Sequence, residues 1–316
     1  MDFMWKNQLY CDILSMFALL HNDKIESIIV LSNSFGGINI MVYEVIDLKI
    51  DGYHLDTSAQ LEVYRLDHKH KEEQKLLRPA VIICPGGGYI NLSNREAEPI
   101  AMRYLAAGYH AFVLKYHVAP TRYPVALLEL ASTVKLLRDH ADKWMIDESK
   151  IIVTGFSAGG HLAASLACFW NKDFLASALN TTNDRIKPDG CILSYPVITS
   201  GEFAHRGSFE HLLGDDESLL EQVSLEKQVS KDTPPVFIWH TLSDACVPVE
   251  NSLLFVMALR KYNISTEFHM YPFGGHGLAL ANEETQTNSV NKIFEECQGW
   301  IDMAIRWIHN LGGEQC

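Results

Sequence analysis

Short apolar runs alternate along the chain with longer segments in which apolar residues recur at helical spacing, and this alternation begins near residue 42. Eight runs are typical of strands: 42–50, 60–66, 80–84, 110–116, 150–154, 191–194, 236–240 and 266–271. Helical patterns fall at 96–107, 125–144, 158–170, 249–262 and 290–309. We expect the first two strands to form a hairpin, and Ser93 with Glu96 predicts a capping box at the first helix. The alternation predicts an α/β fold with an eight-stranded, mostly parallel sheet flanked by helices.

Two segments depart from this alternation. Residues 196–235 separate two strands with a polar, helix-prone stretch. Because connections of this length are usually functional or disordered, we expect a small cap insertion here rather than a plain surface excursion. Residues 1–40 are interpreted as an amino-terminal appendage to a catalytic domain at 41–316. Two alternatives stay open for them: a helix at 9–20 that packs on the domain, or a natural start at Met41.

Composition narrows the class of protein. The 316 residues are 47% hydrophobic and 21% charged, which is ordinary for a globular chain with a full core. The 26 basic and 39 acidic residues give a formal net charge of -13, and both signs are spread along the chain. Such a surface repels nucleic acid and anionic lipid, so we expect no nucleic-acid partner and no membrane partner.

The cysteine and histidine positions predict neither a disulfide framework nor a metal site. The seven cysteines are scattered, mostly within apolar runs, and His68 and His70 lie in a charged stretch typical of a solvated loop. The apolar run at 13–20 is too short to span a bilayer and lacks the flanks of a secretory signal. We therefore expect no metal, no cofactor and a cytoplasmic location.

The strongest chemical signal is Gly155-Phe156-Ser157-Ala158-Gly159, which lies between a strand-like run and an alanine-rich helical run. A serine on a sharp strand-to-helix turn needs small residues two positions before and after it, because larger side chains would clash. The following helix would direct its dipole and the Ala158 N–H toward a developing oxyanion. The motif predicts Ser157 as a nucleophile, and the alternative is a structural Gly-Ser turn.

A serine nucleophile needs a histidine base and an acid that orients the histidine. Asp244 follows the strand at 236–240, and His276 follows the strand at 266–271 between glycines. Serine, aspartate and histidine therefore occur in the chain order of an α/β hydrolase. Taken singly, Asp244 is also typical of a helix cap, and a loop histidine is more often solvated than catalytic.

Other candidates are weaker. Asp215 and Asp216 on the expected cap are interpreted as surface charges. His161 follows the elbow, but its helical position faces away from Ser157.

A glycine-rich loop, Pro85-Gly86-Gly87-Gly88-Tyr89, follows the strand at 80–84. Three glycines let backbone N–H groups approach a substrate without side-chain obstruction, so Gly87, Gly88 and Ala158 are candidate oxyanion donors. A phosphate-binding loop is the alternative for a glycine run. It is disfavoured because the lysine and hydroxyl spacing of a Walker motif is missing.

From about residue 42 to its end, the chain resembles the α/β-hydrolase esterases related to acetyl-xylan and other carbohydrate acetylesterases, near the hormone-sensitive-lipase-like enzymes. The resemblance implies the triad Ser157, Asp244 and His276. Pro85 stands where lipase-like enzymes often have histidine, which favours the carbohydrate-esterase side. The stretches that carry the resemblance are Cys84-Pro85-Gly86-Gly87-Gly88-Tyr89, Ser93-Asn94-Arg95-Glu96-Ala97-Glu98-Pro99, Gly155-Phe156-Ser157-Ala158-Gly159-Gly160-His161, Ser243-Asp244-Ala245-Cys246-Val247-Pro248 and Gly274-Gly275-His276-Gly277.

The residues and the resemblance together predict a serine carboxylesterase that acts on small-molecule esters of short acyl groups, acetate first, with acetylated sugars as one substrate class. Tyr89 and Tyr116 are candidate substrate contacts that stack on a sugar ring, or else they fill the core. The alternatives are a serine peptidase of the prolyl-oligopeptidase type and a catalytically silent binding module. The oligomeric state stays open, a homo-oligomer included.

Overall fold

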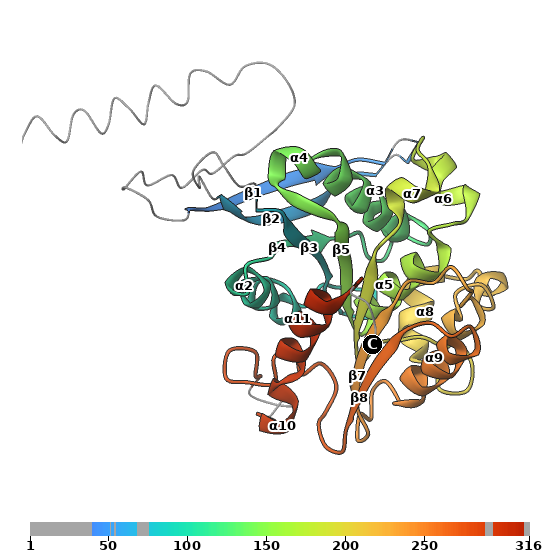
Figure 1. The fold of residues 1–316 in the computed structure, drawn as a ribbon. Helices are drawn as coiled ribbons and strands as arrows, with labels where there is room; N and C mark the ends of the chain where they lie inside the picture. The colour runs from blue at the N-terminus through green and yellow to red at the C-terminus, as the bar shows by residue number, and fades with distance from the viewer. Residues whose placement is uncertain (1–39, 51, 54, 68–75, 288–292, 313–316) are drawn as a thin grey trace, which may run out of the picture.

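The computed structural model describes residues 40–50, 52, 53, 55–67, 76–287 and 293–312 (Figure 1). The interpretations of residues 1–39, of His68 and His70, and of the first positions of the last helical pattern lie outside these ranges.

A single sheet of eight strands organises the described part of the chain, in the order β1-β2-β4-β3-β5-β6-β7-β8. β1 and β2 form the expected antiparallel hairpin, β2 is also antiparallel to β4, and every later pair of neighbours is parallel. The predicted eight-stranded, mostly parallel sheet is thus confirmed. The strands are β1 (Ile40–Leu48), β2 (Ala59–Asp67), β3 (Arg78–Cys84), β4 (His110–Lys115), β5 (Ile146–Phe156), β6 (Gly190–Ser194), β7 (Val236–Thr241) and β8 (Thr266–Tyr271).

Alternate residues of the central strands face two separate helix layers. In β3, Ile82 packs into the core under α3, α5 and α9, whereas Val81 and Ile83 pack into the core under α2 and α11. Figure 1 shows these two groups of helices on opposite sides of the sheet. Strands buried on both faces read as continuous apolar runs, which explains the sequence pattern. The helices are α2 (Glu98–Ala106), α3 (Val125–Asp139), α4 (Ala141–Trp144), α5 (Ala158–Phe169), α6 (Asp173–Ala178), α7 (Asn183–Ile186), α8 (Arg206–Leu213), α9 (Glu250–Lys261), α10 (Glu295–Gln298) and α11 (Trp300–Asn310).

The predicted capping box is wrong. A short 3-10 turn, η1 (Asn94–Glu96), precedes α2, and the Ser93 side chain makes no capping hydrogen bond. The Glu96 carboxylate instead turns away from the helix and accepts hydrogen bonds from Gly86 N and the Tyr195 hydroxyl. The sequence matches the capping-box pattern, but the Glu96 carboxylate bonds distant buried groups instead of the backbone at the start of the helix.

Segment 196–235 folds into α8 and two 3-10 turns, η2 (Glu217–Leu219) and η3 (Leu225–Lys227). Its apolar residues Phe209, Leu212 and Val223 are buried in the main core. His211 Nδ1 donates to Gly88 O at 2.9 Å, so the segment contacts the glycine-rich loop.

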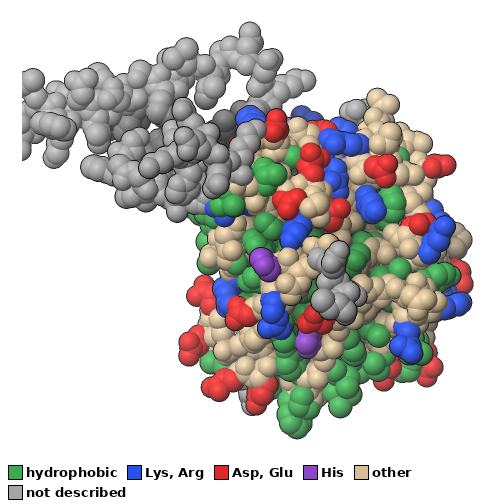
Figure 2. Space-filling view, in the orientation of Figure 1, with side chains coloured by type: hydrophobic (Ala, Val, Ile, Leu, Met, Phe, Trp, Pro, Cys, Tyr) green, Lys and Arg blue, Asp and Glu red, His purple; other side chains and the backbone are tan. Residues whose placement is uncertain are grey.

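The surface carries both charge signs side by side. Figure 2 shows Lys and Arg interspersed with Asp and Glu, and hydrophobic side chains gathered below β7 and β8. Leu242, Met270 and Phe273, which lie in or directly after the carboxyl ends of β7 and β8, are exposed. None of the helices in the described ranges combines the length and apolar character needed to cross a bilayer.

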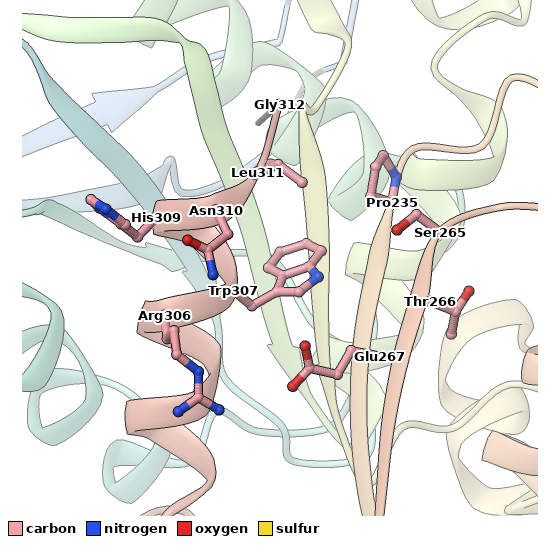
Figure 3. Close-up of a pocket in the computed structure, with 10 residues that line it drawn as sticks. All are labelled: Pro235, Ser265, Thr266, Glu267, Arg306, Trp307, His309, Asn310, Leu311 and Gly312. Atoms are coloured by element: carbon pink, nitrogen blue, oxygen red, sulfur yellow. The ribbon is translucent and has the colours of Figure 1, made fainter. Parts of the chain in front are cut away.

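A groove of about 1030 Å³ opens at the amino-terminal ends of β7 and β8, beside the last turns of α11 (Figure 3). Trp307 and Glu267 face each other across it. Parallel strands place their carboxyl ends at the opposite edge of the sheet, where Ser157, Asp244 and His276 follow β5, β7 and β8. The groove and the candidate active site therefore lie at opposite ends of the sheet.

Candidate active site

Ser157 lies on a sharp turn between β5 and α5. Its φ of 53° and ψ of −118° fall in a region that residues other than glycine rarely adopt. A Cβ added at Gly155 would overlap Gly159 O, and one added at Gly159 would overlap Cys84 O. Both glycines are therefore required by close backbone approach, as the elbow interpretation expects.

The three predicted residues Ser157, His276 and Asp244 lie in one hydrogen-bonded chain. His276 Nε2 is 2.7 Å from Ser157 Oγ, and His276 Nδ1 is 2.7 Å from Asp244 Oδ2. Ser157 and Asp244 are buried, and the His276 side chain is 19% exposed. Nδ1 bonded to the carboxylate leaves Nε2 free of its proton and able to accept the hydroxyl proton of Ser157.

The Asp244 carboxylate is held by four donors. Asp244 Oδ1 accepts from Cys246 N at 2.9 Å and Val247 N at 3.0 Å, and Oδ2 is also 3.3 Å from His240 Nε2. Burial raises the pKa of Asp244, but the hydrogen bonds from His240 and His276 outweigh burial, so the net pKa lies well below its ordinary value. The acid is thus ionised at neutral pH and can stabilise an imidazolium at His276.

The glycine-rich loop approaches the nucleophile closely. A Cβ at Gly86 would lie 3.0 Å from Ser157 Cβ and 2.7 Å from Glu96 Oε2. Gly87 and Gly88 have φ values of 130° and 65°, which favour glycine. Ala158 is the first residue of α5, so its N–H has no carbonyl partner within the helix. The N–H groups of Gly87, Gly88 and Ala158 remain the predicted oxyanion donors.

Tyr89 and Tyr116 are buried side chains of the core. Tyr116 donates its hydroxyl to Pro85 O at 2.6 Å, and the Tyr89 hydroxyl bonds His161 Nδ1 at 2.9 Å. The two residues are 3% and 2% exposed, which fits the packing alternative, and substrate contact stays a prediction. Their hydroxyls bond the glycine-rich loop and α5.

The His161 side chain is buried, and its ring nitrogens bond Tyr89 and Val223 rather than the Ser157 hydroxyl. Its Nε2 donates to Val223 O at 2.8 Å, and burial lowers the pKa of His161 to about 4.

Three residues near the site escaped the sequence analysis. His240, the fifth residue of β7, donates to Asp244 and to Val247 O. Tyr195, which directly follows β6, lies with its ring 5.1 Å from the His276 ring. His205, on segment 196–235, is close enough for burial and the His276 charge to lower its pKa. Their positions at carboxyl ends of strands, or in the long insertion, were the only signals that marked them.

No group of three His, Cys, Asp or Glu side chains is arranged to hold a metal ion within the described ranges.

Comparison with known proteins places this geometry in a family. A model of the BD-FAE family matches residues 66–259, which is more than half of the chain. The chain belongs to the BD-FAE family. This match includes the glycine-rich loop, the elbow and Asp244.

Named relatives of this BD-FAE chain include carbohydrate-active enzymes. It is 41% identical over 223 residues to an endo-1,4-beta-xylanase B of Butyrivibrio fibrisolvens, covering 68% of this chain and 34% of the relative. It is 31% identical over 231 residues to an acetylxylan esterase of Xylanibacter ruminicola, covering 70% of this chain and 45% of the relative. The chain thus spans less than half the length of either relative.

Two solved structures share the whole fold. An acetyl ester-xyloside bifunctional hydrolase from Caldicellulosiruptor lactoaceticus superposes with a TM-score of 0.71 at 36% identity, covering 83% of this chain and 92% of that one. The carboxylesterase Cest-2923 from Lactobacillus plantarum superposes with a TM-score of 0.75 at 31% identity, covering 87% and 100%. The BD-FAE chain therefore has the α/β-hydrolase fold and is similar to esterases, as the resemblance implied.

Proposed function

We propose that this protein is a serine carboxylesterase that uses Ser157, His276 and Asp244 as its catalytic triad. The observation that carries the proposal is the unbroken chain of two 2.7 Å hydrogen bonds that ends on a serine in a strained elbow. Backbone strain of this kind persists where surrounding structure enforces it, and it gathers at active sites.

The reaction follows from the proton path. His276 Nε2 takes the Ser157 proton while Ser157 Oγ attacks the ester carbonyl carbon. The N–H groups of Gly87, Gly88 and Ala158 stabilise the resulting oxyanion. As the tetrahedral intermediate collapses, the bond to the alcohol oxygen breaks and His276 returns the proton to that oxygen. Water, deprotonated by His276 in the same way, then releases the acid from the acyl-enzyme.

The substrate class we infer is a short acyl ester, acetate first, on a carbohydrate or another small alcohol. This inference is supported by the printed names of an acetylxylan esterase and an acetyl ester-xyloside hydrolase among the relatives. Segment 196–235 would act as a small cap on the catalytic domain at 41–316. Its contact with Gly88 and the position of His205 near His276 support this role.

The test is a comparison of wild type, Ser157→Ala and Ser165→Ala on p-nitrophenyl acetate, butyrate and octanoate, with acetylated xylo-oligosaccharide in parallel. Ser165 is a matched control, because it is a buried serine of the following helix, α5, whose hydroxyl donates to His161 O. We expect Ser157→Ala to lose at least about 10⁴-fold in kcat and Ser165→Ala to stay near wild type.

Each result separates the candidate functions. Acetate hydrolysis that falls steeply with acyl length and depends on Ser157 supports a short-acyl esterase, and acetate release from the sugar supports the carbohydrate substrate. Serine-dependent cleavage of a prolyl peptide without ester turnover would favour a peptidase. Full ester turnover by Ser157→Ala would refute the triad.

A further inference from the structure

Glu96 is a buried carboxylate outside the triad, with its residue only 3% exposed. Oε2 accepts the Gly86 N–H at 2.9 Å, and Oε1 accepts the Tyr195 hydroxyl at 2.8 Å. A carboxylate removed from water is costly unless such donors satisfy it. The two bonds link the start of the glycine-rich loop to the residue that follows β6.

Tyr195 carries this link on to the histidine loop. Its hydroxyl accepts the Ala279 N–H at 2.9 Å, and its ring meets the His276 ring edge to face with 5.1 Å between centroids. Its φ of 39° is unusual for a tyrosine, so the surrounding contacts enforce this orientation. Burial and the neighbouring Glu96 raise the pKa of Tyr195 well above its ordinary value, so the hydroxyl remains a donor.

Arg95, the neighbour of Glu96 in η1, also bonds the loop that carries His276. Its Nη1 donates to Gly277 O at 2.8 Å and to Thr285 O at 2.9 Å. Two adjacent residues, Arg95 and Glu96, therefore hold the loops that carry the oxyanion donors and the base. Arg95 and Thr285 are 190 residues apart in the chain.

We propose that Arg95, Glu96 and Tyr195, here called the loop brace, are positioning residues that set the distance between the oxyanion donors and His276. The inference rests on the proposed esterase function and deepens it. None of the three needs to touch substrate. The loop brace would affect the rate by keeping the reacting groups in place, because a displacement of about 1 Å in a reacting group costs up to about 100-fold in rate.

The first test replaces Glu96 by glutamine, which keeps the shape and turns one acceptor into a donor. If the amide oxygen accepts from Gly86, the amide nitrogen faces the Tyr195 hydroxyl as a donor, so the hydroxyl proton of Tyr195 loses its acceptor. We expect kcat on p-nitrophenyl acetate to fall about 10- to 100-fold with KM within about twofold. Asp189→Asn is the matched control, because Asp189 also accepts a backbone N–H, from Ile151, but at the amino ends of the strands.

The second test replaces Arg95 by lysine. Lysine keeps the charge but lacks the planar fork that holds two carbonyls at fixed positions. Arg138→Lys is a matched control, because Arg138 likewise donates to two backbone carbonyls, Glu148 O and Lys187 O, away from the site. We expect a loss of about 10-fold in kcat for Arg95→Lys and wild-type kcat for Arg138→Lys.

Tyr195→Phe keeps the ring against His276 and removes the hydroxyl between Ala279 and Glu96. It therefore separates the hydrogen-bonded link from the aromatic contact, and we expect kcat to fall about as far as in Glu96→Gln. Thermal unfolding midpoints for all variants identify a temperature at which each remains folded, and kinetics are measured there.

A readout independent of turnover is the low-field ¹H resonance of the His276 Nδ1 proton in its bond to Asp244. We expect this resonance to shift or broaden in the brace variants and to stay unchanged in Asp189→Asn and Arg138→Lys. Wild-type kcat and an unchanged resonance in folded Glu96→Gln and Arg95→Lys would overturn the brace. If wild type hydrolyses no ester, the proposed function fails by itself, and the resonance alone then decides on the brace.

Discussion

The two ends of the sheet handle strained backbone differently. At the amino end and in the turns that return to it, Asn180 and Asn263 have positive φ, and asparagine tolerates this conformation. Met145, just before β5, is the exception. At the carboxyl end, the positive-φ residues other than glycine are of types that favour this conformation less than asparagine does. They are Tyr89, Ser157, Tyr195, Ala279 and Ala281.

Polar side chains follow the same division. At the carboxyl end, Glu96, Ser157 and Asp244 are buried and hydrogen-bonded. At the amino end, Arg185 and Asp139 form an exposed ion pair, each more than a third exposed. A strained or buried polar residue costs on the order of 1–3 kcal/mol unless neighbours hold it. The amino end also buries Arg78 and His110, at the first positions of β3 and β4, so the difference lies in the strained residues and in the hydrogen-bonded chain of the proposed triad at the carboxyl end.

The largest effect that would sharpen this comparison is expected from Asp244→Asn. The amide cannot hold His276 in the tautomer that accepts the serine proton, so we expect kcat to fall about 10⁴-fold with a small change in KM. The same change at the amino end, Asp189→Asn, should leave kcat at the wild-type value. Steady-state kinetics on p-nitrophenyl acetate measure both, and equal losses in the two variants would break the comparison.

How far the sequence predicts this molecule depends on whether a residue's partner lies nearby in the chain. Strands such as β3, and the elbow at Ser157, follow from local periodicity and motif, and both were predicted. The short helices α6 and α7 were not, because four to six residues carry too little periodicity.

Partners that are distant in sequence escaped for a different reason. Glu96 matches a capping box locally, yet its acceptor atoms serve Gly86 and Tyr195, the latter 99 residues away. His240 in β7 reads as one more buried strand residue until Asp244 folds back against it. The chain order of the proposed triad can be read from the sequence, whereas the contacts that position its residues form only in the folded chain.

The next effect concerns the stability of the elbow. A methyl group at Gly159 would overlap Cys84 O, and neither the strand nor the helix can move without losing sheet or core contacts. We expect Gly159→Ala to destabilise the protein by at least about 3 kcal/mol, or to prevent folding. Gly299→Ala is the control: its added Cβ meets nothing within 4 Å and its φ is −70°, so we expect a change within about 1 kcal/mol. Urea unfolding measures both, and a Gly159→Ala protein of wild-type stability would contradict the elbow geometry.

A smaller effect comes from the buried His161 on the carboxyl side. Burial depresses its pKa from 6.5 to about 4, so the unfolded state binds more protons between these pH values. The stability associated with neutral His161 is therefore complete above pH 6.5 and is lost as pH falls toward 4. From pH 7 to pH 5 the loss is about 2 kcal/mol. Urea unfolding at both pH values should show this loss in wild type and much less of it in His161→Gln, and equal losses would rule out His161 as the source.

The smallest effect is expected at the amino end, from Arg185→Gln. Arg185 bonds Asp139 at 2.5 Å and lies 3.6 Å from Glu148, but all three side chains are more than a third exposed. Solvent screens such pairs, so removing the guanidinium should cost no more than about 1 kcal/mol, and less at high salt. Urea midpoints at low and high salt, together with kcat on p-nitrophenyl acetate, measure the change. A large loss of kcat would connect the amino end to catalysis and break the division between the two ends, whereas a small, salt-sensitive loss of stability with full activity would strengthen it.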